Sequence, residues 1–312
     1  MQDIQITLAV GKSAKSKTWK NTTVLWSEFC KMLSESTQTR ETLKEFLAST
    51  KEEQSRIKDV GGYVGGYLRN GKRSPNSVVE RSVLTLDVDF ATTDFFELFK
   101  MMFGYAAFIH ATHKHNASEP RYRLLIPLNR GASADEYSAV ARKIAGDIGI
   151  EMFDNTTFEV NRLMFWPSHP KDVEYYCEEQ KGEVLDVDEV LGQYKDWKDT
   201  SLWPTAERKV REIGEAAKKQ EDPYLKKGIV GAFCRTYSIQ QAIETFLSEV
   251  YQEATDGRYT YLHGSTSCGL VIYDNTFAYS HHGTDPAGGK LCNAFDLVRL
   301  HRFGHLDQNE KS

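Results

Sequence analysis

The chain has 312 residues, of which 40% are hydrophobic and 27% are charged, and its formal net charge is −5 at pH 7. This is the composition of an ordinary globular protein with room for two domains. Because the net charge is negative, the protein has no overall basic surface that would bind nucleic acid. Any nucleic-acid site must therefore be a local basic patch. No apolar run approaches the length of a membrane-spanning helix, and the N-terminus lacks a signal-peptide core. Five scattered cysteines without a Cys-x-x-Cys pair favour a reducing cytoplasm, where we expect the protein to reside.

The first 80 residues show regular hydrophobic patterns and one glycine-rich segment. Residues 2–10 alternate apolar and polar side chains, which predicts a half-buried strand, and residues 26–34 and 39–49 are typical of amphipathic helices. Thr39 and Thr42 are candidate caps of the second helix. Residues 61–66 contain four glycines and precede three basic side chains, Arg69, Lys72 and Arg73. The segment is either a phosphate-binding loop or a pair of surface turns.

The most informative stretch is residues 80–90, an apolar strand that ends on Asp87 and Asp89. Side chains at i and i+2 of a strand share a face, so both carboxylates should enter one small volume. Two anions this close repel unless a cation lies between them, and oxygen ligands suit Mg²⁺ or Mn²⁺. The alternative is that one aspartate caps a helix that starts near Thr93 and the other is solvated. If the two carboxylates do repel, replacing either should not unfold the protein.

A basic hairpin is predicted after a strongly apolar helix at residues 94–103. A buried strand over 107–112 leads to a polar tip, and a second apolar strand covers 124–128. In strand geometry His113 and His115 would share a face. The tip could hold a triphosphate beside a metal site, or it could be a solvated surface. Its candidate phosphate ligands are His113, Lys114, His115, Arg121 and Arg123.

Further candidates follow an amphipathic helix at residues 133–148. Asp154 is a third carboxylate, with Glu159 as its rival, and Arg162 lies in a predicted strand over 158–167. A second Asp-x-Asp at Asp186 and Asp188 has no buried strand before it, so we interpret it as a helix cap.

The distribution of polar residues predicts three regions: a core over 1–200, a polar helical linker over 201–226 and an accessory domain over 227–312. The linker helix, about 205–220, is polar on nearly every face, as in helices that connect domains. The accessory domain should contain helices within 227–253, strands over 259–262 and 269–273, and a closing helix over 293–303. Its Cys268, His281, His282 and Cys292 match no standard zinc spacing, so a turn-rich loop is favoured.

We expect the accessory domain to engage single-stranded template. It contains aromatic and basic residues whose pattern suggests exposure, and such side chains stack on bases and contact phosphates. These residues are Arg258, Tyr259, Tyr261, Tyr279, His281, His282, Arg299 and Arg302.

Together these motifs resemble the archaeo-eukaryotic primase superfamily, in particular the primase-polymerases of phages and mobile islands. The strand Leu84–Asp89 resembles the first motif, His113–His115 the second, and Phe153-Asp154 the third. The resemblance covers about residues 1–195, and residues 227–305 resemble the segment that follows the catalytic core in phage primases. The second motif has His113 where the family usually has serine, and position favours His115 as the nucleotide ligand.

The resemblance implies an α/β fold with an RNA-recognition-like mixed sheet and flanking helices, followed by a smaller mixed C-terminal domain. It implies template-directed transfer of NTP or dNTP to a primer 3′-hydroxyl on single-stranded DNA, with two Mg²⁺ or Mn²⁺ ions. Asp87, Asp89 and Asp154 would hold the metals, and His115, Arg121, Arg123 and Arg162 the triphosphate. No Walker motif is present, so a helicase would be absent, lie outside this sequence or be a separate protein.

Two other functions remain open. A rolling-circle endonuclease also uses His-x-His, with a catalytic tyrosine on a following helix. Here Tyr137 is the candidate, with its lysine six residues on at Lys143. A catalytically inactive nucleic-acid-binding replication accessory is the second alternative.

Overall fold

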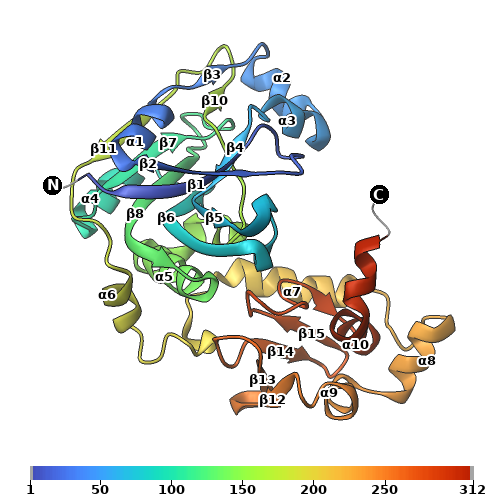
Figure 1. Cartoon of the computed structure of the whole chain (residues 1–312). Helices are drawn as coiled ribbons and strands as arrows, with labels where there is room; N and C mark the ends of the chain where they lie inside the picture. The colour runs from blue at the N-terminus through green and yellow to red at the C-terminus, as the bar shows by residue number, and fades with distance from the viewer. Residues whose placement is uncertain (1–2, 310–312) are drawn as a thin grey trace. The chain divides into compact units, whose positions relative to one another are not determined.

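The structure is a computed structural model that describes residues 3–309 (Figure 1). Its contacts divide the chain into two compact units, Met1–Gln193 and Tyr194–Ser312. Both units combine antiparallel sheets with helices, which confirms the predicted α/β class. The polar helix α7, Glu207–Lys219, falls within the second unit, whereas the sequence suggested a separate linker. Among the described residues, no helix is both long and apolar enough to cross a membrane.

The first unit contains two antiparallel sheets. The four-stranded sheet has the order β2-β1-β4-β9, and the five-stranded sheet has the order β11-β7-β8-β6-β5. The first is formed by β1 (Gln5–Gly11), β2 (Lys20–Leu25), β4 (Gly62–Val64) and β9 (Met164–Phe165). The second is formed by β5 (Gly66–Leu68), β6 (Val78–Val88), β7 (Ala107–Ala111), β8 (Tyr122–Ala132) and β11 (Cys177–Gln180). One hydrophobic cluster joins them, with Ile6 and Tyr63 from one sheet and Val83 and Leu125 from the other.

Several strands differ from the sequence prediction. Strand β1 is confirmed from Gln5, although residue 2 of the predicted strand lies outside the described residues. The predicted strand over 158–167 is reduced to β9, because the chain first forms a 3-10 turn, Asn155–Phe158. Two residues, Ser168–His169, then form β10, which pairs in parallel with β3 (Thr37–Gln38).

The glycine-rich segment is neither a phosphate loop nor a surface turn. It forms β4 and β5, which belong to different sheets and are separated by Gly65. A Cβ added at Gly66 would lie 2.0 Å from the carbonyl oxygen of Glu80, and one at Gly62 would lie 2.4 Å from that of Met164. Only glycine permits the neighbouring backbones to approach this closely. Arg73 packs over Trp19, with 5.4 Å between guanidinium carbon and ring centroid.

The helices predicted for the first unit form, with shorter bounds at several ends, and α3 forms in addition to them. They are α1 (Trp26–Ser34), α2 (Leu43–Ala48), α3 (Lys51–Ile57), α4 (Phe95–Met102), α5 (Ala134–Ile148) and α6 (Val187–Gly192). Thr42 caps α2 by accepting a hydrogen bond from the Glu45 amide, so Thr39 is not the cap. Asp186 accepts bonds from the amides of Asp188 and Glu189, which confirms the second Asp-x-Asp as a helix start.

The second unit is built on a five-stranded antiparallel sheet of order β12-β13-β14-β15-β16. Its strands are β12 (Tyr251–Glu253), β13 (Arg258–Tyr261), β14 (Leu270–Tyr273), β15 (Phe277–Ser280) and β16 (Leu291–Cys292). Its other helices are α8 (Gly228–Thr236), α9 (Ile239–Phe246) and α10 (Ala294–Phe303). Strand β15 was missed, because residues 275–289 contain many turn-forming residues.

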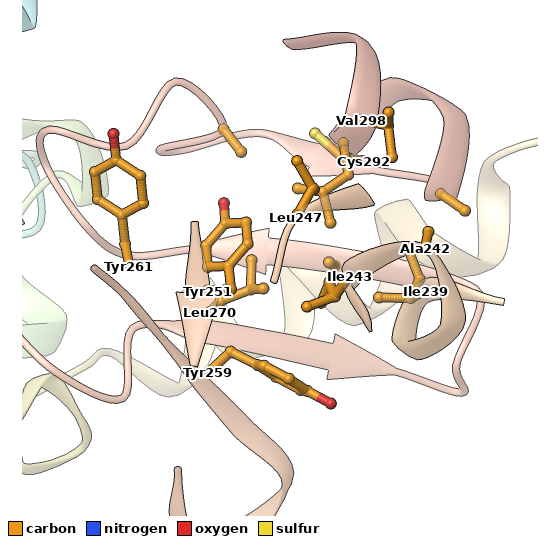
Figure 2. Close-up of a cluster of buried hydrophobic side chains, with 14 of the residues drawn as sticks. Ile239, Ala242, Ile243, Leu247, Tyr251, Tyr259, Tyr261, Leu270, Cys292 and Val298 are labelled. Atoms are coloured by element: carbon orange, nitrogen blue, oxygen red, sulfur yellow. The ribbon is translucent and has the colours of Figure 1, made fainter. Parts of the chain in front are cut away.

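Several aromatic residues that the sequence suggested were exposed are core residues of this unit. Figure 2 shows Tyr251, Tyr259 and Tyr261 with the aliphatic side chains of α9, and all three tyrosines are buried. Tyr279 and His282 are buried as well. The expected exposed stacking surface is therefore wrong for these residues. The alternating pattern that suggested exposure marks a sheet whose inner face contains tyrosines.

A buried arginine lies where β5, β6 and α5 meet in the first unit. The Arg81 side chain is fully buried, and its nitrogens donate to the carbonyl oxygens of Gly65 (3.0 Å), Val160 (2.7 Å) and Val83. Its guanidinium also stacks on the Tyr137 ring at 3.9 Å. A buried charge is tolerated only when its donors are satisfied, and here backbone carbonyls satisfy them.

Replacing this arginine should destabilise the first unit strongly. In Arg81→Met the carbonyl groups lose their donors in a dry interior, so we expect the free energy of unfolding to fall by about 3 kcal/mol or more. The control is Arg56→Met, since Arg56 is exposed and makes only an i,i+3 ion pair; its effect should stay within about 0.5 kcal/mol. Urea unfolding of the two variants measures the difference, and equal midpoints would contradict the assignment.

Candidate active site

A polar cleft of about 160 Å³ lies in the first unit beside the ends of β6, β7 and β8. It contains three carboxylates, Asp87, Asp89 and Asp154. The structure therefore brings together the three predicted acidic residues, and it places the rival Glu159 on the exposed surface outside the cleft. The cationic side chains of the lining are Lys58, Lys114, Arg121, Arg123 and Arg162.

The centre of the cleft wall is a buried ion pair between neighbouring strands. Asp87 on β6 lies directly opposite Arg123 on β8, and Arg123 Nε donates to Asp87 Oδ1 at 2.8 Å. Arg123 Nη1 also donates to the Phe165 carbonyl oxygen at 2.8 Å. Both side chains are almost fully buried. Arg123 therefore holds Asp87 in place, a role the sequence did not predict.

The other two carboxylates also have arginine partners. Asp89 Oδ2 lies 3.2 Å from Arg121 Nη1, and Asp154 Oδ2 accepts a bond from Arg162 Nη2 at 2.9 Å. The Asp154 amide donates to the Asp87 carbonyl oxygen at 2.9 Å, which fixes the third carboxylate beside the first. Within residues 3–309, no group of three His, Cys, Asp or Glu side chains is arranged to hold a metal ion. The carboxylates share one cleft, but each is paired with its own arginine.

The two aspartates of the motif differ in acidity. Burial raises the pKa of Asp87, but the charge and hydrogen bond of Arg123, followed by the charge of Arg162, outweigh it, so the pKa lies below its usual value. The pKa of Asp89 is raised, first by burial and then by the charges of Asp87 and Asp154, with Arg121 only partly offsetting them. The negative charge of Asp89 is therefore only partly compensated, and it is repelled by the charges of Asp87 and Asp154.

The histidines of the second motif do not share a face. Residues 113–114 lie in a turn, closed by a hydrogen bond from the His115 amide to the Thr112 carbonyl oxygen, so strand alternation does not apply. The His113 ring is buried between Ser168 and Glu41. His115 lies outside the cleft lining, and its Nδ1 contacts the backbone of Arg121. His113 and Lys114 both line the cleft.

Two ionisable lining residues were missed by the sequence analysis. Lys58 follows α3, and burial followed by the charge of Lys114 lowers its pKa. No local pattern identifies it, because α3 reads as a surface helix. His110 lies within β7 directly opposite Arg123. The signal for His110 was available, since an ionisable residue inside an apolar strand requires an explanation.

Two buried polar atoms of the lining residues have no hydrogen-bond partner among the described residues. They are His110 Nε2 and Arg162 Nε. Native proteins rarely leave such atoms unpaired, so each is a position where a bound water or ligand can supply the missing partner. His110 is a neutral imidazole, because burial, followed by the charge of Arg123, lowers its pKa to about 3.

Two alternative sites are not supported by their geometry. Tyr137 is fully buried and its hydroxyl lies 3.3 Å from the Thr85 carbonyl oxygen, so this hydroxyl is not accessible as a nucleophile. In the second unit, His282 Nε2 accepts bonds from the amides of Tyr261 and Gly269, and its Nδ1 lies 2.8 Å from Thr266 Oγ1. Both ring nitrogens of His282 are thus engaged in hydrogen bonds within the protein.

The first unit is thus an α/β domain with a cleft that combines three carboxylates and several cationic side chains. The chain belongs to the family of the VapE N-terminal domain, whose model matches residues 1–206. Among solved structures, it is similar to the AEP domain of the primase-polymerase of cyanophage S-2L, with 12% sequence identity and a TM-score of 0.34. That match covers 60% of this chain and 87% of the other. No curated protein matches the sequence. The family match covers the part of the chain on which the resemblance identified from the sequence rests.

The ion pair at the cleft wall changes the expectation that Asp87 can be replaced without loss of stability. Asp87→Asn leaves Arg123 buried without its counter-charge, so it should lower the free energy of unfolding by about 3 kcal/mol at pH 7. Because the folded pKa of Asp87 is depressed, its contribution is present above the unfolded-state pKa of about 3.9 and is lost as pH falls through the folded value. Unfolding of Asp87→Asn and the surface control Asp188→Asn between pH 3 and 7 measures both effects.

The substitution Asp89→Asn should change the free energy of unfolding in the opposite direction. The folded pKa of Asp89 is raised, so its ionisation weakens folding at pH values above that pKa. We expect the variant to be a few tenths of a kcal/mol more stable at pH 7, a small gain because Arg121 and solvent screen the charge. The gain should vanish in acid below the raised pKa. A loss of stability at pH 7 would contradict the inferred repulsion.

Proposed function

We propose that this chain is a template-directed nucleotidyltransferase, a primase-polymerase for the replication of a phage or mobile element. It would add NTP or dNTP to a primer 3′-hydroxyl on a single-stranded DNA template. The observation that supports it is the single cleft that combines three carboxylates with five cationic side chains. Phosphoryl transfer requires this combination, because carboxylates bind metal while cations bind phosphate oxygens.

The donor set suits two Mg²⁺ or Mn²⁺ ions. Asp87, Asp89 and Asp154 offer only oxygen ligands, which these cations prefer. The raised pKa of Asp89 is the observation that fits a cation, since added positive charge would relieve the repulsion from Asp87 and Asp154. When bound, such ions would activate the attacking hydroxyl and stabilise the leaving pyrophosphate.

The chain's own cations would orient the triphosphate. Arg121 and Arg162 are only partly buried, and each contacts its aspartate through one nitrogen, so other nitrogens remain for phosphate oxygens. Lys114 and Lys58 complete the cationic lining. Arg123 would act through Asp87, since its position is fixed by the ion pair and by Phe165. His115 would position Arg121 through the turn backbone.

The decisive test is primer extension with labelled nucleotide. Asp89→Asn should abolish incorporation while the protein remains folded, since it removes a metal ligand and leaves the buried ion pair intact. The matched control is Asp188→Asn, in the second Asp-x-Asp, which makes a surface ion pair with Arg130 and should retain activity.

Other outcomes would identify another function. Extension by Asp89→Asn at the wild-type rate would refute the proposal. A covalent tyrosine–DNA adduct without nucleotide consumption would identify an endonuclease. DNA binding by a wild-type protein that incorporates no nucleotide would identify an inactive accessory.

The cationic lining gives a separate prediction about affinity. Lys114→Met removes a charged contact to the triphosphate, worth about 1.5–3 kcal/mol, and should weaken nucleotide binding about 10- to 150-fold. The control Lys171→Met removes an exposed lysine outside the cleft and should change affinity less than about twofold. Calorimetric titration with a nucleoside triphosphate in Mg²⁺ buffer measures both. Equal affinities of the two variants would remove Lys114 from the phosphate site.

A further inference from the structure

His110 is a buried histidine that the proposed chemistry does not use. Its side chain is in the middle of the five-stranded sheet, where β7 places it opposite Arg123 and β11 places it opposite Cys177. The residue is 1% exposed, yet it contributes to the lining of the cleft. It belongs to the row Asp87–Arg123–His110 across three neighbouring strands, and directly opposite residues project from the same face of a sheet.

The hydrogen bonds of the ring define its tautomer. His110 Nδ1 lies 2.9 Å from the carbonyl oxygen of Ala111. A carbonyl oxygen only accepts, so Nδ1 carries the proton and donates. In a neutral ring Nε2 then has no proton and can only accept a hydrogen bond. It has no partner among the described residues, so the cleft contains a buried acceptor that requires a donor from outside the chain.

The surroundings decide which donor fits. Mg²⁺ and Mn²⁺ prefer oxygen ligands, so the ring nitrogen is a poor ligand for the proposed ions, and the positive charge of Arg123 directly opposite the ring disfavours an ammonium group at Nε2. A phosphate oxygen cannot donate a proton to Nε2 while it is ionised. Among the uncharged donors of a nucleotide, the sugar hydroxyls lie closer to the phosphates than the amino groups of the base do. A site that binds a hydroxyl through a buried acceptor discriminates against analogues that lack it, because the acceptor is then left unpaired.

We propose that His110 Nε2 accepts a hydrogen bond from a ribose hydroxyl of the incoming nucleotide and thereby selects among nucleotide sugars. This inference rests on the proposed function, because it assumes a nucleotide in the cleft, but it concerns binding and does not require catalysis. It makes His110 a specificity-determining residue that neither the sequence motifs nor the metal chemistry identifies.

The test removes the acceptor and the hydroxyls in turn. Wild-type protein, His110→Phe and His110→Gln are titrated calorimetrically with ATP, 2′-deoxyATP and 2′,3′-dideoxyATP in Mg²⁺ buffer without DNA. Phenylalanine retains the ring but has no acceptor, and glutamine offers an oxygen near the position of Nε2. The control is His169→Phe, whose histidine lies outside the cleft lining and contacts Ser36. Thermal unfolding verifies that each variant is folded.

We expect wild-type affinity to fall by roughly 2- to 12-fold at the step that removes the recognised hydroxyl. In His110→Phe this difference in affinity between the two nucleotides should disappear. The variant should bind the analogue that lacks the hydroxyl about as well as wild type does. Glutamine should restore part of the discrimination, and the control should retain all of it. The step at which affinity falls identifies the 2′- or the 3′-hydroxyl.

The contrary results are distinct. If His110→Phe weakens all three nucleotides equally, the ring contacts base or phosphate and the inference is wrong. If every folded variant discriminates like wild type, His110 has only a structural role.

If wild-type protein binds nucleotide without discriminating among sugars, the inference fails while the proposed function stands. If the protein binds all three nucleotides with the expected discrimination but extends no primer, the proposed function fails and the inference stands. Absence of any nucleotide binding overturns both.

Discussion

The buried pair between Asp87 and Arg123 is the interaction on which the cleft depends. An ionised carboxylate inside a sheet is unfavourable unless a cation with good geometry accompanies it, and β8 supplies that cation directly across the strand register. The pair also ties the cleft to the rest of the unit, because Arg123 bonds the backbone of Phe165 and the Asp87 carbonyl group bonds the amide of Asp154. Three separate chain segments are therefore aligned by one charged contact.

The two aspartates of the motif have divided roles as a result. Asp87 is the structural member, with its charge compensated inside the protein, whereas Asp89 reaches the end of the strand and keeps a partly compensated charge. A description of Asp-x-Asp as two equivalent ligands misses this difference. The difference arises from the position of the strand end, since β6 ends at Val88 and leaves Asp89 beyond the sheet.

Much of this arrangement could be predicted from local sequence. Period-two alternation identified β1, and a short apolar run identified β6. The cap candidates Thr42 and Asp186 placed two helix starts. The carboxylates at 87, 89 and 154 were correctly brought to one site. The failures have a common cause, which is that contacts distant in sequence decided them. Gly66 is explained only by the backbone of Glu80, the turn at His113 only by its contacts with Glu41 and Ser168, and the buried tyrosines of the second unit only by the sheet they complete. No local pattern contains these partners.

The excess of cations in the cleft has a kinetic consequence. Five lysine and arginine side chains face three carboxylates, so the cleft is a positive region on a chain whose overall charge is negative. A concave surface of one sign focuses its field and speeds the encounter with ligands of the opposite sign, an effect that salt screens. Polyanionic ligands should therefore be guided into this cleft at low ionic strength, while the acidic remainder of the surface repels them elsewhere. The electrostatic field thus favours the cleft as the place of first contact with an anion, before any hydrogen bond is made.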